Sequence, residues 1–169
     1  IYAAEKATML GAKVIAMSDS SGYIIDENGI NLDVMKEIKE VRRGRISEYA
    51  KSVKGSVFHK DGRIWNTPCD IALPCATQNE LNKEDAETLI KNGVIAVCEG
   101  ANMPTTPDAI DVLMQNHILF APGKASNAGG VATSALEMSQ NSLRLSWTAE
   151  EVDARLKDIM ENIYKTVSE

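Results

Sequence analysis

The chain has 169 residues, of which 44% are hydrophobic, and a formal net charge of −6 at pH 7. This length and composition suit a single domain with one sizeable core. The net negative charge argues against a nucleic-acid partner or an anionic membrane surface, because no basic face offsets it. Apolar runs are short and interrupted by charges, which also argues against a membrane-spanning segment.

Three cysteines, Cys69, Cys75 and Cys98, show no C-x-x-C spacing. Only His59 and His117 are available to complete a metal cluster or a nucleophile–base pair. We therefore expect reduced, mostly buried thiols in a cytoplasmic protein, with no metal site and no covalent nucleophile.

The first ten residues have a helical composition but no cap and no preceding turn, and Gly11 ends them as a C′ glycine does. The first residue, Ile1, is not a methionine. We expect the chain to begin inside a helix and to be a fragment of a longer protein.

A short apolar strand is predicted over 14–17, followed by the polar segment Ser18-Asp19-Ser20-Ser21-Gly22. In doubly wound nucleotide-binding folds, an acidic residue at the end of the second strand contacts the adenosine ribose, and Asp19 occupies the corresponding place. Aspartate and serine also initiate ordinary turns, which is the alternative interpretation. Residues 23–26 are predicted to be a short extended piece.

A helix capped by Asn31 is predicted next, with one apolar face made by Leu32, Met35, Ile38 and Val41. The run Arg42-Arg43-Gly44-Arg45 ends it. These cations either complement the helix dipole or bind a phosphate through their guanidinium groups. Residues 47–53 are expected to add a short helix before a polar, glycine-rich loop.

Three strand–helix units follow at even spacing, with strands predicted over 70–73, 94–98 and 118–121. Helices are predicted to begin after Asn82, with Asp85 completing the cap, and after Thr105 or Thr106. Because the strands are continuously apolar, we expect helices on both faces and a parallel sheet with right-handed crossovers. Ligands bind at the carboxyl ends of such strands, so the segments expected to converge are 18–22, 74–78, 99–104 and 123–130.

The last strand leads through Pro122-Gly123 into a small-residue loop, and Gly129-Gly130 open a helix predicted over about 130–142. Free N–H groups there would suit a dinucleotide or a carboxylate, although glycine pairs also mark simple turns. Further on, Thr148 and Glu151 form a capping box. The helix that follows carries an apolar stripe expected to pack against the sheet, made by Val152, Leu156, Ile159, Ile163 and Val167.

Three segments resemble the glutamate dehydrogenase family, hexameric small-subunit group, in order and spacing: Pro74–Glu80, Glu99–Pro107 and Lys124–Asn141. The similarity extends over nearly the whole chain. It implies an α/β fold with a Rossmann-like, doubly wound, mostly parallel sheet. Residues 1–169 would be a single coenzyme-binding domain from a larger two-domain enzyme. The first strand, the glycine-rich loop and the domain that carries the catalytic groups would lie outside this chain.

The same resemblance implies roles for individual residues. The segment at 18–22 is similar to that of NADP-using bacterial enzymes, so the adenosine end of the coenzyme would meet Ser18, Asp19, Ser20, Arg42 and Arg45. The rest of the coenzyme would lie along Cys75, Ala76 and Thr77, with Asn102 and Asn127 at the nicotinamide ribose and carboxamide. Val131 and Ser134 would contact glutamate. The resemblance places no catalytic residue and no metal ligand within the chain.

The parent reaction implied is the reversible oxidative deamination of L-glutamate to 2-oxoglutarate and ammonium, with NADP as coenzyme and NAD as the alternative. The parent is expected to be a cytoplasmic homo-hexamer without nucleic-acid or membrane partners, and the fragment alone is expected to be inactive. One alternative is a leucine, valine or phenylalanine dehydrogenase of the same architecture. Another is a non-catalytic nucleotide-binding or assembly module.

Overall fold

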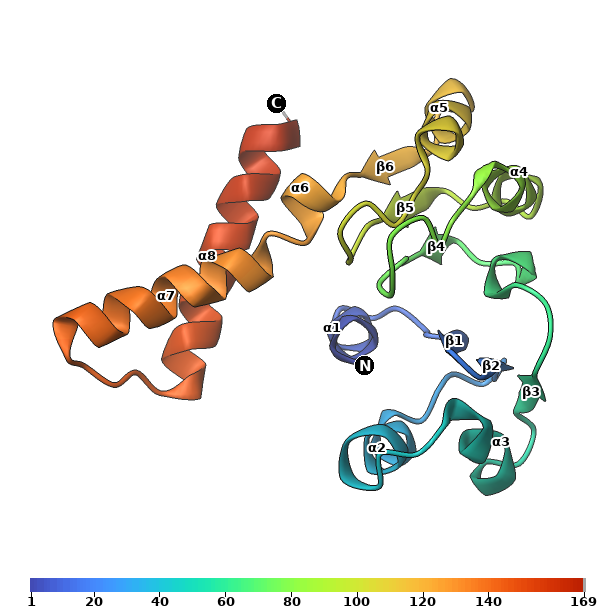
Figure 1. Cartoon of the computed structure of the whole chain (residues 1–169), viewed down its shortest axis with the longest axis horizontal. Coiled ribbons are helices and arrows are strands. Elements are labelled where there is room, and N and C mark those ends of the chain that lie inside the picture. Colours follow the sequence, from blue (N-terminus) through green and yellow to red (C-terminus); the bar gives the residue numbers. More distant parts are fainter. Residues whose placement is uncertain (169) are drawn as a thin grey trace.

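Two three-stranded sheets organise the structure, a computed structural model that describes residues 1–168 (Figure 1). The antiparallel sheet has the order β1-β2-β3 and is formed by β1 (Ala16–Asp19), β2 (Gly22–Ile25) and β3 (Val57–His59). The parallel sheet has the order β4-β5-β6 and is formed by β4 (Ile71–Ala72), β5 (Ala96–Cys98) and β6 (Leu119–Ala121).

The longer helices are α1 (Tyr2–Met9), α4 (Lys83–Lys91), α5 (Pro107–Gln115), α7 (Gly129–Leu143) and α8 (Ala149–Ser168). Shorter helical pieces are α2 (Leu32–Lys36), the π-helical turn η1 (Glu37–Val41), the 3₁₀ turns η2 (Ile46–Glu48) and η3 (Ile64–Asn66), α3 (Tyr49–Ser52) and α6 (Gly123–Ser126). None of the helices described over residues 1–168 combines the length and the apolar character needed to cross a membrane.

The parallel sheet predicted from the sequence is confirmed for three strands, but the strand expected at 14–17 is not one of them. It begins two residues later, as β1, and pairs antiparallel with β2. The reason is the length of the connection, because Ser20 and Ser21 alone join the two strands. A two-residue turn can only return the chain beside itself, whereas parallel neighbours need a long crossover.

Helices cover one face of the parallel sheet, not both as predicted. Ala72, Val97 and Phe120 are paired neighbours on one face and pack against residues of α4 and α5. The opposite face carries Ile71 and Leu119, which are 50% and 65% exposed. Continuous apolar character in these strands therefore indicates two faces that avoid water, but only one of them is covered by the described residues.

The helix after Asn31 starts as predicted, since the Asn31 side chain accepts a hydrogen bond from the Val34 N–H. Met35 and Ile38 are fully buried, but Val41, expected on the same face, is 70% exposed. The last turn of this helix is π-helical. The wider turn changes the angular position of each following residue, so the three-residue spacing no longer keeps Val41 on the buried face.

A pair of helices, α7 and α8, projects away from both sheets (Figure 1). The predicted capping box is confirmed, because the Thr148 hydroxyl accepts from the Glu151 N–H and the Glu151 carboxylate accepts from the Thr148 N–H. The prediction that the α8 stripe packs against the sheet is wrong. α8 packs against α7 and α6, and Leu156 and Met160 approach Gly129. An apolar stripe shows that a helix face is covered but not what covers it.

A buried hydrogen-bond network holds the antiparallel half together. The Tyr49 hydroxyl donates to Asp26 Oδ2 at 3.0 Å and accepts from the Asn31 N–H at 2.7 Å. Asp26 is only 2% exposed, and Tyr49 is fully buried. Burial raises the pKa of Tyr49, so the phenol keeps the proton that it donates. One side chain thereby joins the end of β2, the start of α2 and α3.

We predict that Tyr49→Phe lowers the free energy of unfolding by about 1–3 kcal/mol, because the ring still packs while a buried carboxylate oxygen and a backbone N–H lose their partner. Urea unfolding followed by circular dichroism measures the change. Tyr164→Phe is the control, since Tyr164 is 72% exposed on α8 and its loss should shift the value by no more than about 0.5 kcal/mol. Equal midpoints for the two variants would contradict this assignment.

Candidate functional site

The carboxyl ends of β4, β5 and β6 lead into three segments that meet on one rim of the parallel sheet, residues 74–80, 99–105 and 122–127. Backbone bonds join them: the Gly100 N–H donates to the Pro74 carbonyl at 2.8 Å, and the Glu99 N–H donates to the Ala121 carbonyl at 3.0 Å. Strands of a parallel sheet all end on the same side. Of the four segments expected to converge, 74–78, 99–104 and 123–130 therefore follow the strands of this sheet, whereas 18–22 follows β1 in the antiparallel sheet.

A pocket of about 420 Å³ lies at this rim, and its lining consists of Cys75, Ala76, Gln78, Gly100, Ala101, Asn102 and Asn127. Asn127 Nδ2 donates to Asn102 Oδ1 at 3.0 Å. Among the described residues, this bond leaves the Asn102 amide nitrogen and the Asn127 amide oxygen without a partner, so the pair offers one donor and one acceptor. A ligand carboxamide or a sugar diol, each of which can both donate and accept hydrogen bonds, could bind to this pair.

The wall of the pocket is packed too tightly for a side chain at Gly100. A Cβ added there would lie 2.4 Å from the Cys75 sulfur, well inside van der Waals contact. Glycine lets the two strand ends approach this closely. Partial burial, and then the Glu80 carboxylate, raise the pKa of Cys75. The thiol is therefore protonated at neutral pH and contributes an uncharged surface to the pocket.

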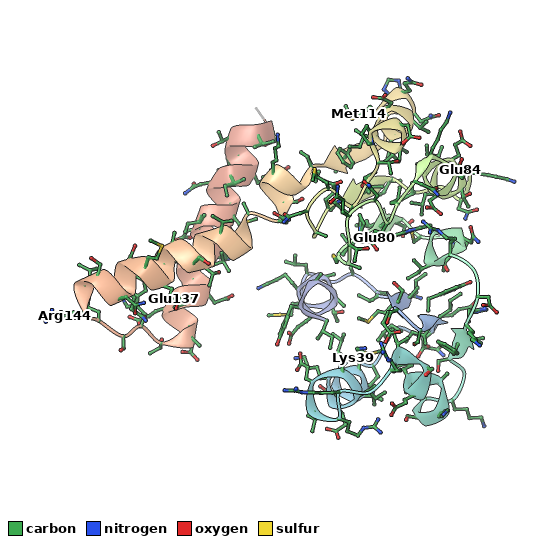
Figure 2. The ribbon with its side chains drawn as sticks, viewed as in Figure 1. Lys39, Glu80, Glu84, Met114, Glu137 and Arg144 are labelled. Atoms are coloured by element: carbon green, nitrogen blue, oxygen red, sulfur yellow. The ribbon has the colours of Figure 1, made fainter. Side chains whose placement is uncertain are left out.

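Two glutamates that the sequence analysis did not single out organise these loops. Glu80, labelled in Figure 2, accepts the Ala76 N–H through Oε1 at 2.7 Å and so holds the pocket segment after β4. Glu99 is 5% exposed and accepts backbone N–H groups from Thr105 and Gly123. For Glu99, the available sequence signal was the position of a charged residue directly after the apolar strand predicted over 94–98.

A second, larger cavity of about 910 Å³ adjoins the first and shares Gln78, Asn102 and Asn127 with it. Its remaining lining is more apolar and includes Ile110 and Phe120. The Asn102–Asn127 pair thus lies where the two hollows meet.

A separate polar cluster lies at the end of β1, around Asp19. The Asp19 carboxylate accepts four hydrogen bonds: from the Ser21 N–H at 2.8 Å and hydroxyl at 2.5 Å, from Lys39 Nζ at 2.8 Å and from the Ile46 N–H at 3.0 Å. These use about all the acceptor positions that a carboxylate has. Asp19 thus holds Lys39 and the 44–46 segment against the end of β1, in addition to shaping the turn.

The predicted arginines behave differently from one another. Arg45 Nη1 donates to the Ser20 hydroxyl at 2.7 Å, which brings a cation to the β1–β2 turn as expected. Arg42 pairs instead with Glu48 at 3.0 Å and Glu37 at 3.9 Å. Lys39, labelled in Figure 2, is the cation that the sequence analysis missed. Its position three residues before the arginine run was the signal.

The other predicted positions lie outside the two cavities. Ser18 is exposed on β1, and Thr77 is exposed in the loop after β4. Val131 and Ser134 are exposed on α7, and neither belongs to the lining of either cavity. Over residues 1–168, no group of three or more His, Cys, Asp or Glu side chains is arranged to hold a metal ion.

The Asp19 cluster predicts a pH dependence of stability. Partial burial alone would raise the pKa of the Asp19 carboxyl, but hydrogen bonds from Lys39, Ser21 and Ile46 outweigh it and hold that pKa well below its usual range. Since the unfolded value is about 3.9, the stabilisation is complete above about pH 5 and is lost as the pH falls toward the folded pKa.

We therefore expect the difference in unfolding free energy between the wild type and Asp19→Asn to be constant near neutral pH and to shrink from pH 5 to pH 2. Urea titrations at several pH values measure it. Asp153→Asn on the exposed surface of α8 controls for the loss of one negative charge. A difference for Asp19→Asn that does not depend on pH would refute the assignment.

Comparison with known proteins identifies the family of this chain. The Glutamate/Leucine/Phenylalanine/Valine dehydrogenase family matches residues 1–169. An NAD(P)-specific glutamate dehydrogenase of Xylanibacter ruminicola and an NADP-specific one of Haemophilus influenzae are each 57% identical over 166 residues, covering 96% of this chain and 37% of the relative. The crystal structure of Plasmodium falciparum glutamate dehydrogenase matches with a TM-score of 0.92 and 46% identity, over 96% of this chain and 36% of that one. The chain spans little more than a third of these relatives, and it belongs to the Glutamate/Leucine/Phenylalanine/Valine dehydrogenase family.

Proposed function

We propose that this chain is the coenzyme-binding domain of a glutamate dehydrogenase, and that its parent interconverts L-glutamate with 2-oxoglutarate and ammonium. The observation that carries the proposal is the Asn102–Asn127 amide pair, hydrogen-bonded at 3.0 Å where the carboxyl ends of the parallel strands meet. Ligands of open α/β sheets bind at this edge. The names of the relatives with 57% identity support the choice of glutamate.

In this proposal the amide pair fixes the nicotinamide end of the coenzyme. The free amide nitrogen of Asn102 and the free oxygen of Asn127 bind its ribose and carboxamide, while Cys75, Ala76 and Thr77 lie along the adjoining part. When bound, the nicotinamide supplies the hydride chemistry of the reaction. In this proposal the domain contributes orientation of the nicotinamide.

We assign the substrate contacts to α7, which begins two residues after Asn127. Val131 lies on the first turn of this helix and Ser134 on the next, so both are close in sequence to the amide pair. An aliphatic side chain and a hydroxyl suit the methylene groups and a carboxylate of glutamate, respectively. Both residues are exposed within this chain, which leaves them free to face the substrate domain of the parent.

For the coenzyme we propose NADP, with NAD as the alternative. Its 2′-phosphate would meet Ser20 and Arg45, with Lys39 close by, and Ser18 and Arg42 would lie at the border of this contact. Because the Asp19 carboxylate is already hydrogen-bonded to Lys39 and three other donors, its charge is directed at the protein. It therefore competes less with a phosphate than a free carboxylate would.

We further propose that the two sheets are parts of one Rossmann-like, doubly wound sheet that the rest of the parent completes. β1 and β4 are both edge strands among the described residues. A central strand placed between them would satisfy both edges. Ile71 and Leu119 are exposed on the uncovered face of the parallel sheet. Burying these apolar side chains would favour packing of that face against further parts of the parent. We propose a cytoplasmic homo-hexamer as the parent assembly.

The test of this function compares two proteins, the chain alone and the chain with the missing part of its parent restored. We expect the restored protein to oxidise glutamate and the chain alone to be folded but inactive. A misplacement of about 1 Å can cost on the order of a hundredfold in rate, and the chain alone lacks the positioning groups altogether. Activity with leucine, valine or phenylalanine in place of glutamate would favour another member of the family. No activity in the restored protein would support a non-catalytic module.

A second prediction concerns the coenzyme. In the restored protein, Arg45→Ala should lower kcat/KM for NADP about tenfold or more and leave kcat/KM for NAD nearly unchanged, because a hydrogen bond to a charged group contributes roughly 1.5–3 kcal/mol. Arg144→Ala, at the far end of α7 (Figure 2), removes the same charge and should change neither value. A wild-type preference for NAD, or equal losses with both coenzymes in Arg45→Ala, would show that this arginine does not bind the 2′-phosphate of NADP.

A further inference from the structure

Glu99 is a buried acidic residue that contacts the backbone of two segments lining the candidate site. It follows the last residue of β5 and is 5% exposed. Its two carboxylate oxygens bind different segments, since Oε1 accepts the Thr105 N–H at 3.2 Å and Oε2 accepts the Gly123 N–H at 2.6 Å. One segment carries Asn102, and the other begins the short helix that ends just before Asn127.

The main chain of Glu99 strengthens the same connection. Its carbonyl accepts a hydrogen bond from the Ser126 hydroxyl at 2.5 Å, and Ser126 immediately precedes Asn127. The two segments are also in close contact, because a Cβ added at Gly123 would lie 2.8 Å from the Ala101 carbonyl oxygen. Glu99 is therefore bonded on both sides of the amide pair, within one residue of Asn127 and three of Asn102.

We propose that Glu99 is a positioning residue, which sets the relative placement of Asn102 and Asn127 and through them the orientation of the nicotinamide. This inference rests on the proposed function of the amide pair. Both Glu99 carboxylate oxygens accept backbone N–H groups, so its influence on the coenzyme passes through the two loops. Its effect is to keep two loops in one fixed geometry, so that the free donor and the free acceptor of the pair face the same ligand.

The chemistry requires a carboxylate of this length. Both oxygens face backbone N–H donors, so both must accept. In Glu99→Gln the amide NH₂ would stand against one of the two N–H groups, and that segment would lose its anchor at nearly constant side-chain volume. Glu99→Asp would be one methylene too short to reach both segments at once. Small shifts of groups that orient a reacting ring are costly, on the order of a hundredfold in rate for about 1 Å.

The experiment uses the full-length parent enzyme. For Glu99→Gln we expect kcat with glutamate to fall about tenfold to a hundredfold and the affinity for NADPH, measured by its fluorescence, to fall by a smaller factor. The affinity for adenosine 2′,5′-bisphosphate should stay within about twofold of wild type. This probe carries only the adenosine end, whose proposed contacts, Ser20 and Arg45, lie on the antiparallel sheet.

Glu84→Gln is the matched control, since it makes the same chemical change at an exposed position of α4 (Figure 2) and should leave all three values unchanged. Ser126→Ala is the second variant. It removes the hydroxyl bond to the Glu99 carbonyl, together with that hydroxyl's longer contacts to the Ala121 and Pro122 carbonyls at 3.2 and 3.0 Å, while the Glu99 carboxylate keeps its bonds. It should show the same pattern with a smaller loss. It also decides the question if Glu99→Gln does not fold.

Three outcomes would overturn the inference: unchanged kcat in both variants, equal losses for NADPH and for the bisphosphate, or a loss in Glu84→Gln as large as in Glu99→Gln. Failure of the proposed function would look different. In that case the wild-type parent would neither oxidise glutamate nor bind NADPH, whatever residue stands at position 99.

Discussion

The hydrogen bonds that β5 makes to its two parallel neighbours are the constraint on which the site depends. Because β4 and β6 run in the same direction as β5, the three loops that follow them must leave the sheet on the same side. The backbone bonds from Gly100 to Pro74 and from Glu99 to Ala121 continue this pairing beyond the strands. Residues separated by some fifty positions in the chain are thereby brought to one pocket.

The antiparallel half obeys a different constraint. A two-residue turn forces β2 back beside β1, and the side chain at the end of β1 then decides what packs there. Asp19 draws in Lys39 and the Ile46 N–H, while Asp26 at the end of β2 draws in Tyr49. Two carboxylates, one mostly buried and one fully buried, thus connect the hairpin to the helices that follow it. The polar groups of this half are organised around charge, whereas the pocket on the parallel sheet is lined mainly by uncharged groups.

Local signals were sufficient to predict the starts of the capped helices and the parallel strands, but not α6, which lies in the segment expected to be a loop. The caps at Asn31, Asn82 and Thr148 involve residues three positions apart, so the sequence alone contains both partners. The errors arose where the outcome depends on distant contacts. β3 lies in the segment expected to be a polar loop and forms by pairing to β2. The π-helical turn exposes Val41, and α8 packs against α7 and α6. Asn102 and Asn127 were proposed from the family resemblance, while Glu99 and Lys39 were not singled out because their partners lie in other segments.

The division between the two halves has a physical reason if the chain binds a dinucleotide as proposed. A phosphate attracts a cation over several ångströms, so Arg45 and Lys39 need only be near it, and flexible side chains are adequate. A nicotinamide must instead be held at a defined distance and angle to the substrate, and an amide pair gives such control only if its own loops are fixed. The deeper burial of Glu99 compared with Arg45 agrees with this difference in required precision. A buried carboxylate with two backbone donors suits the loops that we propose to hold the reacting end of the ligand, and Glu99 is bonded to both of those loops.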